Sequence, residues 1–186
     1  DCLIIDTGLN SAPLVDFLKE NSLNPVAIIF THGHVDHIKG VGDLRENWPR
    51  IKVAIHKNDA DMLHDAEKNL SIMTGIDLTA DPAEVIIEDE SEIEFASIKL
   101  QVIHTPGHTQ GGICLYNAEA KVAFVGDTLF ASSIGRTDLP GGNYPQLVAG
   151  IKDKLLKLDG ETQVLPGHGP ATTIEVEKNT NQYLTN

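Results

Sequence analysis

The chain has 186 residues, of which 41% are hydrophobic, and this size and composition suit one domain with a substantial core. Its formal net charge is −13, from 27 acidic and 14 basic residues. Nucleic acids and anionic membrane surfaces are therefore excluded as expected partners, because both require a basic face on the protein. No stretch approaches the roughly 18–20 apolar residues that a membrane span needs.

The N-terminal half of the chain alternates strand and helix patterns. Apolar runs predict strands, and Val26–Phe30, a continuous run of five, is typical of a strand that is buried on both faces. The expected strands are Cys2–Asp6, Val26–Phe30 and Val53–Ile55. The expected helices are Ala12–Asn21 with Ser11 as its N-cap, His37–Glu46, and Lys57–His64. The chain begins at Asp1 and enters a strand at once, so we expect that a segment upstream is missing.

Residues 66–83 show no clear pattern, and residues 84–95 carry six acidic side chains that predict a solvated hairpin or sheet edge. The expected strands beyond them are Lys99–His104, Gly112–Tyr116, Lys121–Val125 and Gln163–Leu165. Residues 131–144 predict a loop, and the expected helices are Pro145–Leu158 and Ile174–Leu184. Two sheets back to back with helices outside would satisfy this order, and one doubly wound sheet is the alternative.

The two cysteines, Cys2 and Cys114, lie far apart without CxxC spacing, and each sits in an apolar run. Two buried thiols are therefore expected rather than a disulfide or a nucleophile. Free thiols suit a reducing compartment, which predicts a cytoplasmic protein.

Histidine and aspartate residues follow four of the predicted strands. The stretch THGHVDH (31–37) follows the second strand, and TPGHT (105–109), GDT (126–128) and PGHG (166–169) follow three later strands. Loops at strand ends carry functional sites on a rigid scaffold, and the neighbouring glycines let backbone pack closely around a ligand. These four segments together predict a metal site.

The number of candidate ligands indicates two metal ions. The expected ligands are five imidazoles and two carboxylates: His32, His34, Asp36, His37, His108, Asp127 and His168. One tetrahedral zinc takes only three or four protein ligands, whereas two ions that share a bridging carboxylate fit seven. Imidazole and carboxylate ligands suit zinc, our first choice, with iron or manganese as alternatives. His56 and His64 are expected to be structural or exposed, and His104, on a strand, to be at most a supporting residue.

The HxHxDH loop, with His108, Asp127 and His168 in order behind it, resembles the metallo-β-lactamase superfamily over most of the chain. The resemblance implies a four-layer αβ/βα sandwich, as a single domain over residues 1–186, with the metals at one edge between the sheets. The family usually has strands ahead of the first one here, which supports a missing N-terminus.

The resemblance also implies which side chains bind each metal. His32, His34 and His108 would bind the first ion. Asp36, His37 and His168 would bind the second ion, and Asp127 would bridge the two.

Within this superfamily, the sequence is similar to small glyoxalase II-like hydrolases. The segments that carry this likeness are GDTLF (126–130), GRTDLPGG (135–142) and GHGPATT (167–173). True β-lactamases do not use the bridging aspartate, and the RNA-processing branch has additional basic elements. Because the chain ends soon after His168, we expect no counterpart of the glutathione-binding helical domain of glyoxalase II.

The activity implied is hydrolysis of a small-molecule thioester such as S-lactoylglutathione, by attack of a hydroxide that bridges two metals. Asp36 and Asp127 would be the catalytic carboxylates, with Asp36 orienting the hydroxide. Arg136 would contact a substrate anion, or else pair with Asp138 inside its own loop. Asp6 would hold a ligand histidine or only shape the end of a strand.

Two other functions remain open. A persulfide dioxygenase of the same fold carries a GRTD-like loop and one iron, which His34, His108 and Asp127 would hold here. A non-catalytic binding protein is the third reading, although all seven ligand positions are intact.

Overall fold

The computed structural model describes residues 1–185 and divides into two compact units. The first unit comprises residues 1–87 and 94–98, and the second comprises residues 88–93 and 99 onward. The described strands form a four-stranded sheet, a six-stranded sheet and a two-stranded ribbon. The alternative of one doubly wound sheet is therefore wrong.

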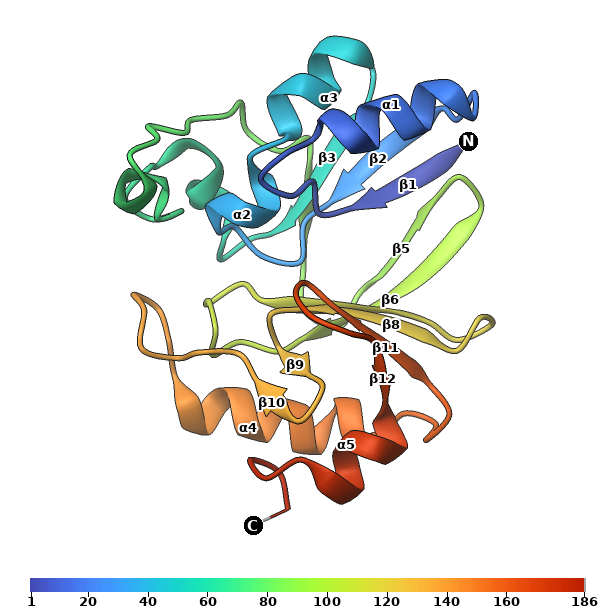
Figure 1. Cartoon of the computed structure of the whole chain (residues 1–186), viewed down its shortest axis with the longest axis vertical. Helices are drawn as coiled ribbons and strands as arrows, with labels where there is room; N and C mark the ends of the chain where they lie inside the picture. The colour runs from blue at the N-terminus through green and yellow to red at the C-terminus, as the bar shows by residue number, and fades with distance from the viewer. Residues whose placement is uncertain (186) are drawn as a thin grey trace. The chain divides into compact units, whose positions relative to one another are not determined.

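The first unit is built on a parallel sheet with the strand order β1-β2-β3-β4. Its strands are β1 (Cys2–Ile5), β2 (Pro25–Ile29), β3 (Lys52–His56) and β4 (Val85–Ile87). Parallel strands need long crossover connections, and helices α1 (Ala12–Glu20) and α3 (Val41–Asn47) provide two of them. Both helices lie on the same side of this sheet (Figure 1).

The core of the first unit lies between these helices and the sheet. Leu18 of α1 and Leu44 of α3 belong to the same buried cluster as Ile28 and Phe30. Each of these side chains is 3% exposed or less, so each contributes about 1.5–3 kcal/mol through burial. This packing fixes the end of β2, where the histidine loop begins.

The helix predicted from His37 to Glu46 is two helices, α2 (Val35–Ile38) and α3. The chain turns at Gly40, where an added Cβ would lie 2.7 Å from the Cβ of Ser11. Only glycine fits so close an approach, and the break could not be read from the helical pattern. Ser11 precedes α1 as expected, but its hydroxyl makes no cap and donates to Asp43.

The middle of the chain contains 3₁₀ turns rather than an α-helix. The helix expected over Lys57–His64 is a 3₁₀ helix, η1 (Ala60–His64), and η2 (Ser71–Thr74) follows it. The buried amide of Asn69 donates to the carbonyls of Met62 and Leu78. These side-chain bonds to the backbone replace a regular helical ladder.

The second unit contains most of a six-stranded sheet with the order β12-β11-β8-β7-β6-β5. Its strands are β5 (Glu92–Phe95), β6 (Ile98–His104), β7 (Ile113–Asn117), β8 (Val122–Gly126), β11 (Gln163–Pro166) and β12 (Thr172–Thr173). β8 and β11 are parallel, and Gly126 pairs with Pro166. The loops that carry Asp127 and His168 therefore follow the carboxyl ends of two neighbouring parallel strands.

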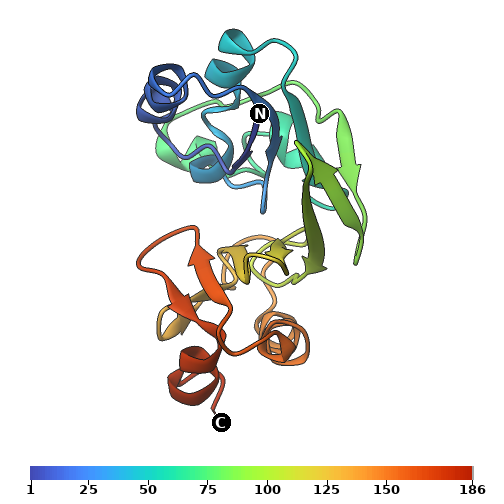
Figure 2. The same cartoon turned by 90° about the vertical axis from the view of Figure 1, so that its right-hand side faces the viewer.

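Helices cover one face of this second sheet. They are α4 (Tyr144–Asp153), η3 (Leu155–Lys157) and α5 (Ile174–Thr180), drawn in orange to red in Figure 2. Leu147 and Ile151 of α4 pack in one buried cluster with Val125 and Val164. The last helix ends at Thr180 rather than near Leu184, and the side chain of Asn181 donates to the carbonyl of Ser133 instead.

The acidic stretch 84–95 lies at sheet edges, as expected: β4 is an edge strand of one sheet, and β5 is an edge strand of the other. β5 also forms a hairpin with β6 through the two-residue turn at Ala96 and Ser97. Charged side chains protect such edges from pairing with other chains. Within residues 1–185, no helix has the length and apolar character required to cross a membrane.

Candidate metal centre

The loop after β2 brings three imidazoles together inside the first unit. His32, His34 and His37 are each 5% exposed or less. The ring of His32 lies edge-on to His34, with centroids 4.8 Å apart, and 4.0 Å from the ring of His37. Asp36 and His37 lie on α2, so a short helix presents the last two predicted ligands of this loop.

Asp6 supports two of these histidines from the end of β1. Its carboxylate accepts hydrogen bonds from Nδ1 of His37 and from the backbone N–H and hydroxyl of Thr31, each at 2.8 Å. The Thr31 hydroxyl donates its only proton to Asp6, so it accepts from Nδ1 of His32 at 3.1 Å. The expected hydrogen bond from Asp6 to a candidate ligand histidine is observed, and the φ of 56° shows that Asp6 also turns the strand end.

Residues of the segment 59–69 also form hydrogen bonds with this histidine loop. The buried Asp59 carboxylate accepts from the N–H of Gly33 at 3.2 Å, and the N–H of Val35 donates to the carbonyl of Asn69. A Cβ on Gly33 would lie 2.5 Å from the Cβ of Met62. These contacts were not predicted from the sequence. Gly33, between two candidate ligand histidines, was the one signal in this loop that indicated close packing.

The second unit places two further predicted ligands, His108 and His168, beside the carboxylate of a third, Asp127. Nε2 of His108 lies 3.6 Å from Oδ2 of Asp127, and Nε2 of His168 lies 3.7 Å from the same oxygen. Nδ1 of His108 donates to the carbonyl of Arg136 at 2.8 Å. The His108 and Asp127 side chains are 5% and 13% exposed, whereas His168 is 55% exposed.

His104 supports the loop that carries His108. Its Nε2 lies 3.0 Å from the carbonyl of Gln110, two residues beyond His108, and its Nδ1 lies 3.1 Å from the Asp89 carboxylate. The carbonyl of Gln110 can only accept, so Nε2 of His104 is the donor in that contact. The supporting role considered for His104 therefore has a structural basis in this loop.

Arg136 pairs with Asp138 through two hydrogen bonds of 2.8 and 2.7 Å. The guanidinium holds the pKa of the Asp138 carboxyl at about 2. Both side chains are more than half exposed, so this pair alone adds little stability. The pairing inside the loop is thus observed, and the contact of Arg136 with a substrate anion stays a prediction.

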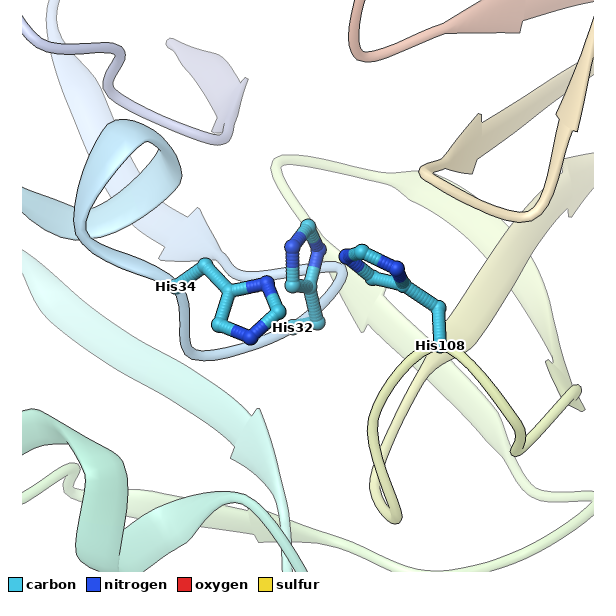
Figure 3. Close-up of side chains that lie close together, drawn as sticks. All are labelled: His32, His34 and His108. Atoms are coloured by element: carbon cyan, nitrogen blue, oxygen red, sulfur yellow. The ribbon is translucent and has the colours of Figure 1, made fainter. Parts of the chain in front are cut away.

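The donor chemistry fits divalent metal ions. His32, His37 and His108 each donate from Nδ1 to the protein, which fixes the tautomer and leaves Nε2 as the ligand nitrogen. Figure 3 shows the rings of His32 and His34 on the loop after β2 and the ring of His108 on the loop after β6. The seven predicted ligands are five imidazoles and two carboxylates, which are side chains that bind such ions.

Asp6→Asn is expected to weaken metal binding by about 10–100-fold, because the amide has one acceptor oxygen where the carboxylate uses two, for Thr31 and for Nδ1 of His37. Asparagine tolerates the left-handed backbone at this position, so the turn itself is retained. Competition with a chromophoric chelator measures the affinity. Asp16→Asn, at an exposed position on α1, is the matched control. Equal affinity of Asp6→Asn and the unsubstituted protein would contradict the assigned role of Asp6.

Comparison with known proteins identifies relatives along nearly the whole chain. A family model described as "Metallo-beta-lactamase superfamily" matches residues 1–168. The chain is 41% identical to a probable metallo-hydrolase, YqgX, of Bacillus subtilis, covering 98% of this chain and 87% of the relative. It is 33% identical to the hydroxyacylglutathione hydrolase GloC of Haemophilus influenzae, covering 97% and 86%.

Solved structures agree with this result. BLEG-1, described as a B3 metallo-β-lactamase, superposes with a TM-score of 0.94 at 39% identity, covering 99% of this chain and 88% of that one. TTHA1623 in a di-iron-bound form gives 0.85 at 36% identity, covering 97% and 88%. ETHE1 from Myxococcus xanthus gives 0.78 at 29% identity, covering 97% and 72%. The expected mixed α/β fold class is confirmed, and the chain belongs to the metallo-β-lactamase superfamily, whose hydrolases bind metals through the His and Asp types found here.

Proposed function

We propose that this protein is a binuclear metallohydrolase that cleaves a small-molecule thioester of the S-lactoylglutathione type. The observation that carries the proposal is the Asp127 carboxylate, whose Oδ2 lies within 3.7 Å of the imidazoles of both His108 and His168. A carboxylate placed between ligand imidazoles suits a residue shared by two ions. The similarity to GloC supports the thioester substrate class.

Each proposed role follows from the chemistry of the side chain. When bound, two divalent ions supply an activated water at neutral pH and polarise the substrate carbonyl. Asp127 would hold the ions together with the histidines, and Asp36, 32% exposed and adjacent to His37, would orient the attacking water. The thiolate of the substrate is a good leaving group, so no strong general acid is required of the chain.

The metal identity and the cellular compartment are also part of the proposal. Zinc is our first choice, while the di-iron form of TTHA1623 supports iron as the alternative. Cys2 and Cys114 are free, and burial raises the pKa of the Cys114 thiol to about 11, so this thiol is inert as a nucleophile. Unpaired cysteines support a reducing compartment such as the cytoplasm. The acidic net charge supports a small-molecule substrate rather than a nucleic acid or a membrane.

Arg136→Ala is expected to raise KM for an anionic thioester by about 10-fold with little change in kcat, because a charged hydrogen bond to the substrate contributes about 1.5–3 kcal/mol. Part of this energy is offset, since Arg136 must leave Asp138 to bind the substrate anion. Steady-state kinetics with S-lactoylglutathione and with a neutral thioester provide the comparison. An equal KM change for both substrates would remove Arg136 from anion recognition.

The proposal is tested by elemental analysis of the purified protein together with turnover assays. Two metals per chain and rapid hydrolysis of S-lactoylglutathione are expected. A β-lactam is assayed in parallel because of the similarity to BLEG-1, and we expect slower turnover of it. One iron per chain, no thioester hydrolysis and oxygen uptake with glutathione persulfide would replace the proposal with the dioxygenase. The GRTD sequence at 135–138 fits both candidates, and the similarity to ETHE1 is compatible with either one.

A further inference from the structure

A two-stranded ribbon directly after Asp127 folds the chain back, so that residues 135 and 136 lie near Asp127. β9 (Leu129–Phe130) pairs antiparallel with β10 (Ser133–Ile134), and the N–H of Gly135 donates to the carbonyl of Thr128 at 3.2 Å. Gly135 and Arg136 thereby lie beside residues 127 and 108 of the same unit.

Gly135 leaves no room for a side chain. An added Cβ would overlap the carbonyl oxygen of Asp127 and would lie 3.5 Å from the Cβ of His108. The obstacle at Asp127 is backbone, which cannot rotate away as the end of a flexible side chain could. Any larger residue at position 135 therefore displaces the backbone of Asp127 or the ribbon itself.

Arg136 acts on His108 through its backbone. The carbonyl of Arg136 can only accept, so the 2.8 Å hydrogen bond places a proton on Nδ1 of His108. Nε2 then carries the lone pair, and it is the nitrogen that lies 3.6 Å from Oδ2 of Asp127. The side chain of Arg136 is turned to Asp138 and makes no part of this contact.

The ribbon is itself held by α5. The fully buried Glu177 accepts from the N–H of Ser132 at 2.9 Å and from the hydroxyl of Thr172 at 2.7 Å. The side chain of Asn181 donates to both Glu177 and the carbonyl of Ser133. Two of these hydrogen bonds reach the ribbon, at Ser132 and Ser133, and the other two hold the Glu177 carboxylate in place.

We propose that the backbone of Gly135 and Arg136 is a positioning device for two metal ligands. Gly135 sets where Asp127 sits, and the Arg136 carbonyl sets the tautomer and direction of His108. This inference rests on the metal binding in the proposed function and is independent of the substrate. Gly135 and Arg136 are positioning residues here, since they act through Asp127 and His108.

Gly135→Ala tests the device by metal affinity. We expect affinity for Zn²⁺ to fall by about 10–100-fold, the range typical of lost support around a metal ligand. Gly42→Ala is the matched control, because a Cβ at this exposed position of α3 meets nothing within 4 Å. Arg136→Ala keeps the backbone carbonyl and is expected to keep Zn²⁺ affinity within about twofold of the unsubstituted protein. If Arg136→Ala weakens Zn²⁺ binding as much as Gly135→Ala does, the proposal that backbone atoms position Asp127 and His108 is contradicted.

A second measurement needs no substitution and no metal. Long-range ¹H–¹⁵N NMR of the metal-free protein, well above the ordinary histidine pKa of about 6.5, reports the tautomer of His108 directly. We expect the Nδ1–H form, and an Nε2–H form would overturn the proposal even if Gly135→Ala does not fold. Because this test uses neither metal nor thioester, it separates failure of the device from failure of the proposed hydrolase function.

Discussion

Asp127→Ala is expected to lower thioester turnover by at least about 10³-fold and to reduce the metal content from two ions per chain. The carboxylate is the one group that contacts the imidazoles of both His108 and His168 in the described part of the second unit. Loss of several kcal/mol of charge stabilisation in the transition state corresponds to a rate decrease of this size. The measurement is kcat/KM for S-lactoylglutathione together with elemental analysis of the same preparation.

The control for this substitution is Asp16→Ala, which removes an exposed carboxylate from α1 and is expected to leave metal content and turnover unchanged. Thermal unfolding of both variants shows whether the chain remains folded. Full metal content and full turnover in Asp127→Ala would contradict the assignment of Asp127 as a shared ligand. That result would also revive the reading of a non-catalytic binding protein.

Removal of metal by a strong chelator is expected to abolish turnover and to lower the melting temperature by about 8–16 °C. Ligands that bind only the folded state stabilise it by about 4 kcal/mol at 1,000 times Kd, and each kcal/mol shifts Tm by about 2–4 °C in a chain of this size. The buried imidazoles of His32, His34, His37 and His108 make the folded state the preferred binder. Calorimetry before and after chelation measures the shift.

Adding back Zn²⁺, Mn²⁺ or Fe²⁺ one at a time then identifies the working metal. Restoration of hydrolysis by zinc supports our first choice, whereas restoration by iron alone points to the alternative that TTHA1623 suggests. Hydrolysis that persists in protein shown to be metal-free would refute the metal-dependent mechanism. An unchanged Tm after complete chelation would show that the imidazole cluster is folded without help from metal.

The candidate ligands could be predicted from the sequence because each stands in a short motif at the end of a strand. THGHVDH, PGHT, GDT and PGHG are local patterns, and the strands ahead of them are apolar runs that are easily recognised. The structure places β2, β6, β8 and β11 ahead of these motifs, as expected. The catalytic assignments of Asp36 and Asp127 and the seven ligand assignments remain predictions, as does the single-domain organisation.

Secondary structure was less predictable where tertiary contacts override local preference. The break between α2 and α3 arises because Gly40 lies against Ser11, which is 29 residues earlier in the chain. The cap expected from Ser11 is lost because its hydroxyl donates to Asp43 in α3. Both departures depend on the packing of α1 against α3, which no window of sequence contains.

The sequence by itself determined the types of candidate ligand, their order and their attachment to strand ends, because metal ligation requires particular side chains in short motifs. Only the tertiary structure decided what supports them. Asp6 reaches Thr31 and His37, the carbonyl of Arg136 reaches His108, and Gly135 touches Asp127. Most of these contacts join residues more than 20 positions apart, and those of Thr31, Arg136 and Gly135 use backbone atoms that every residue has. The contact of Asp6 with a histidine was one of two roles considered from the sequence, whereas the backbone contacts leave no trace in side-chain identity and depend on the fold.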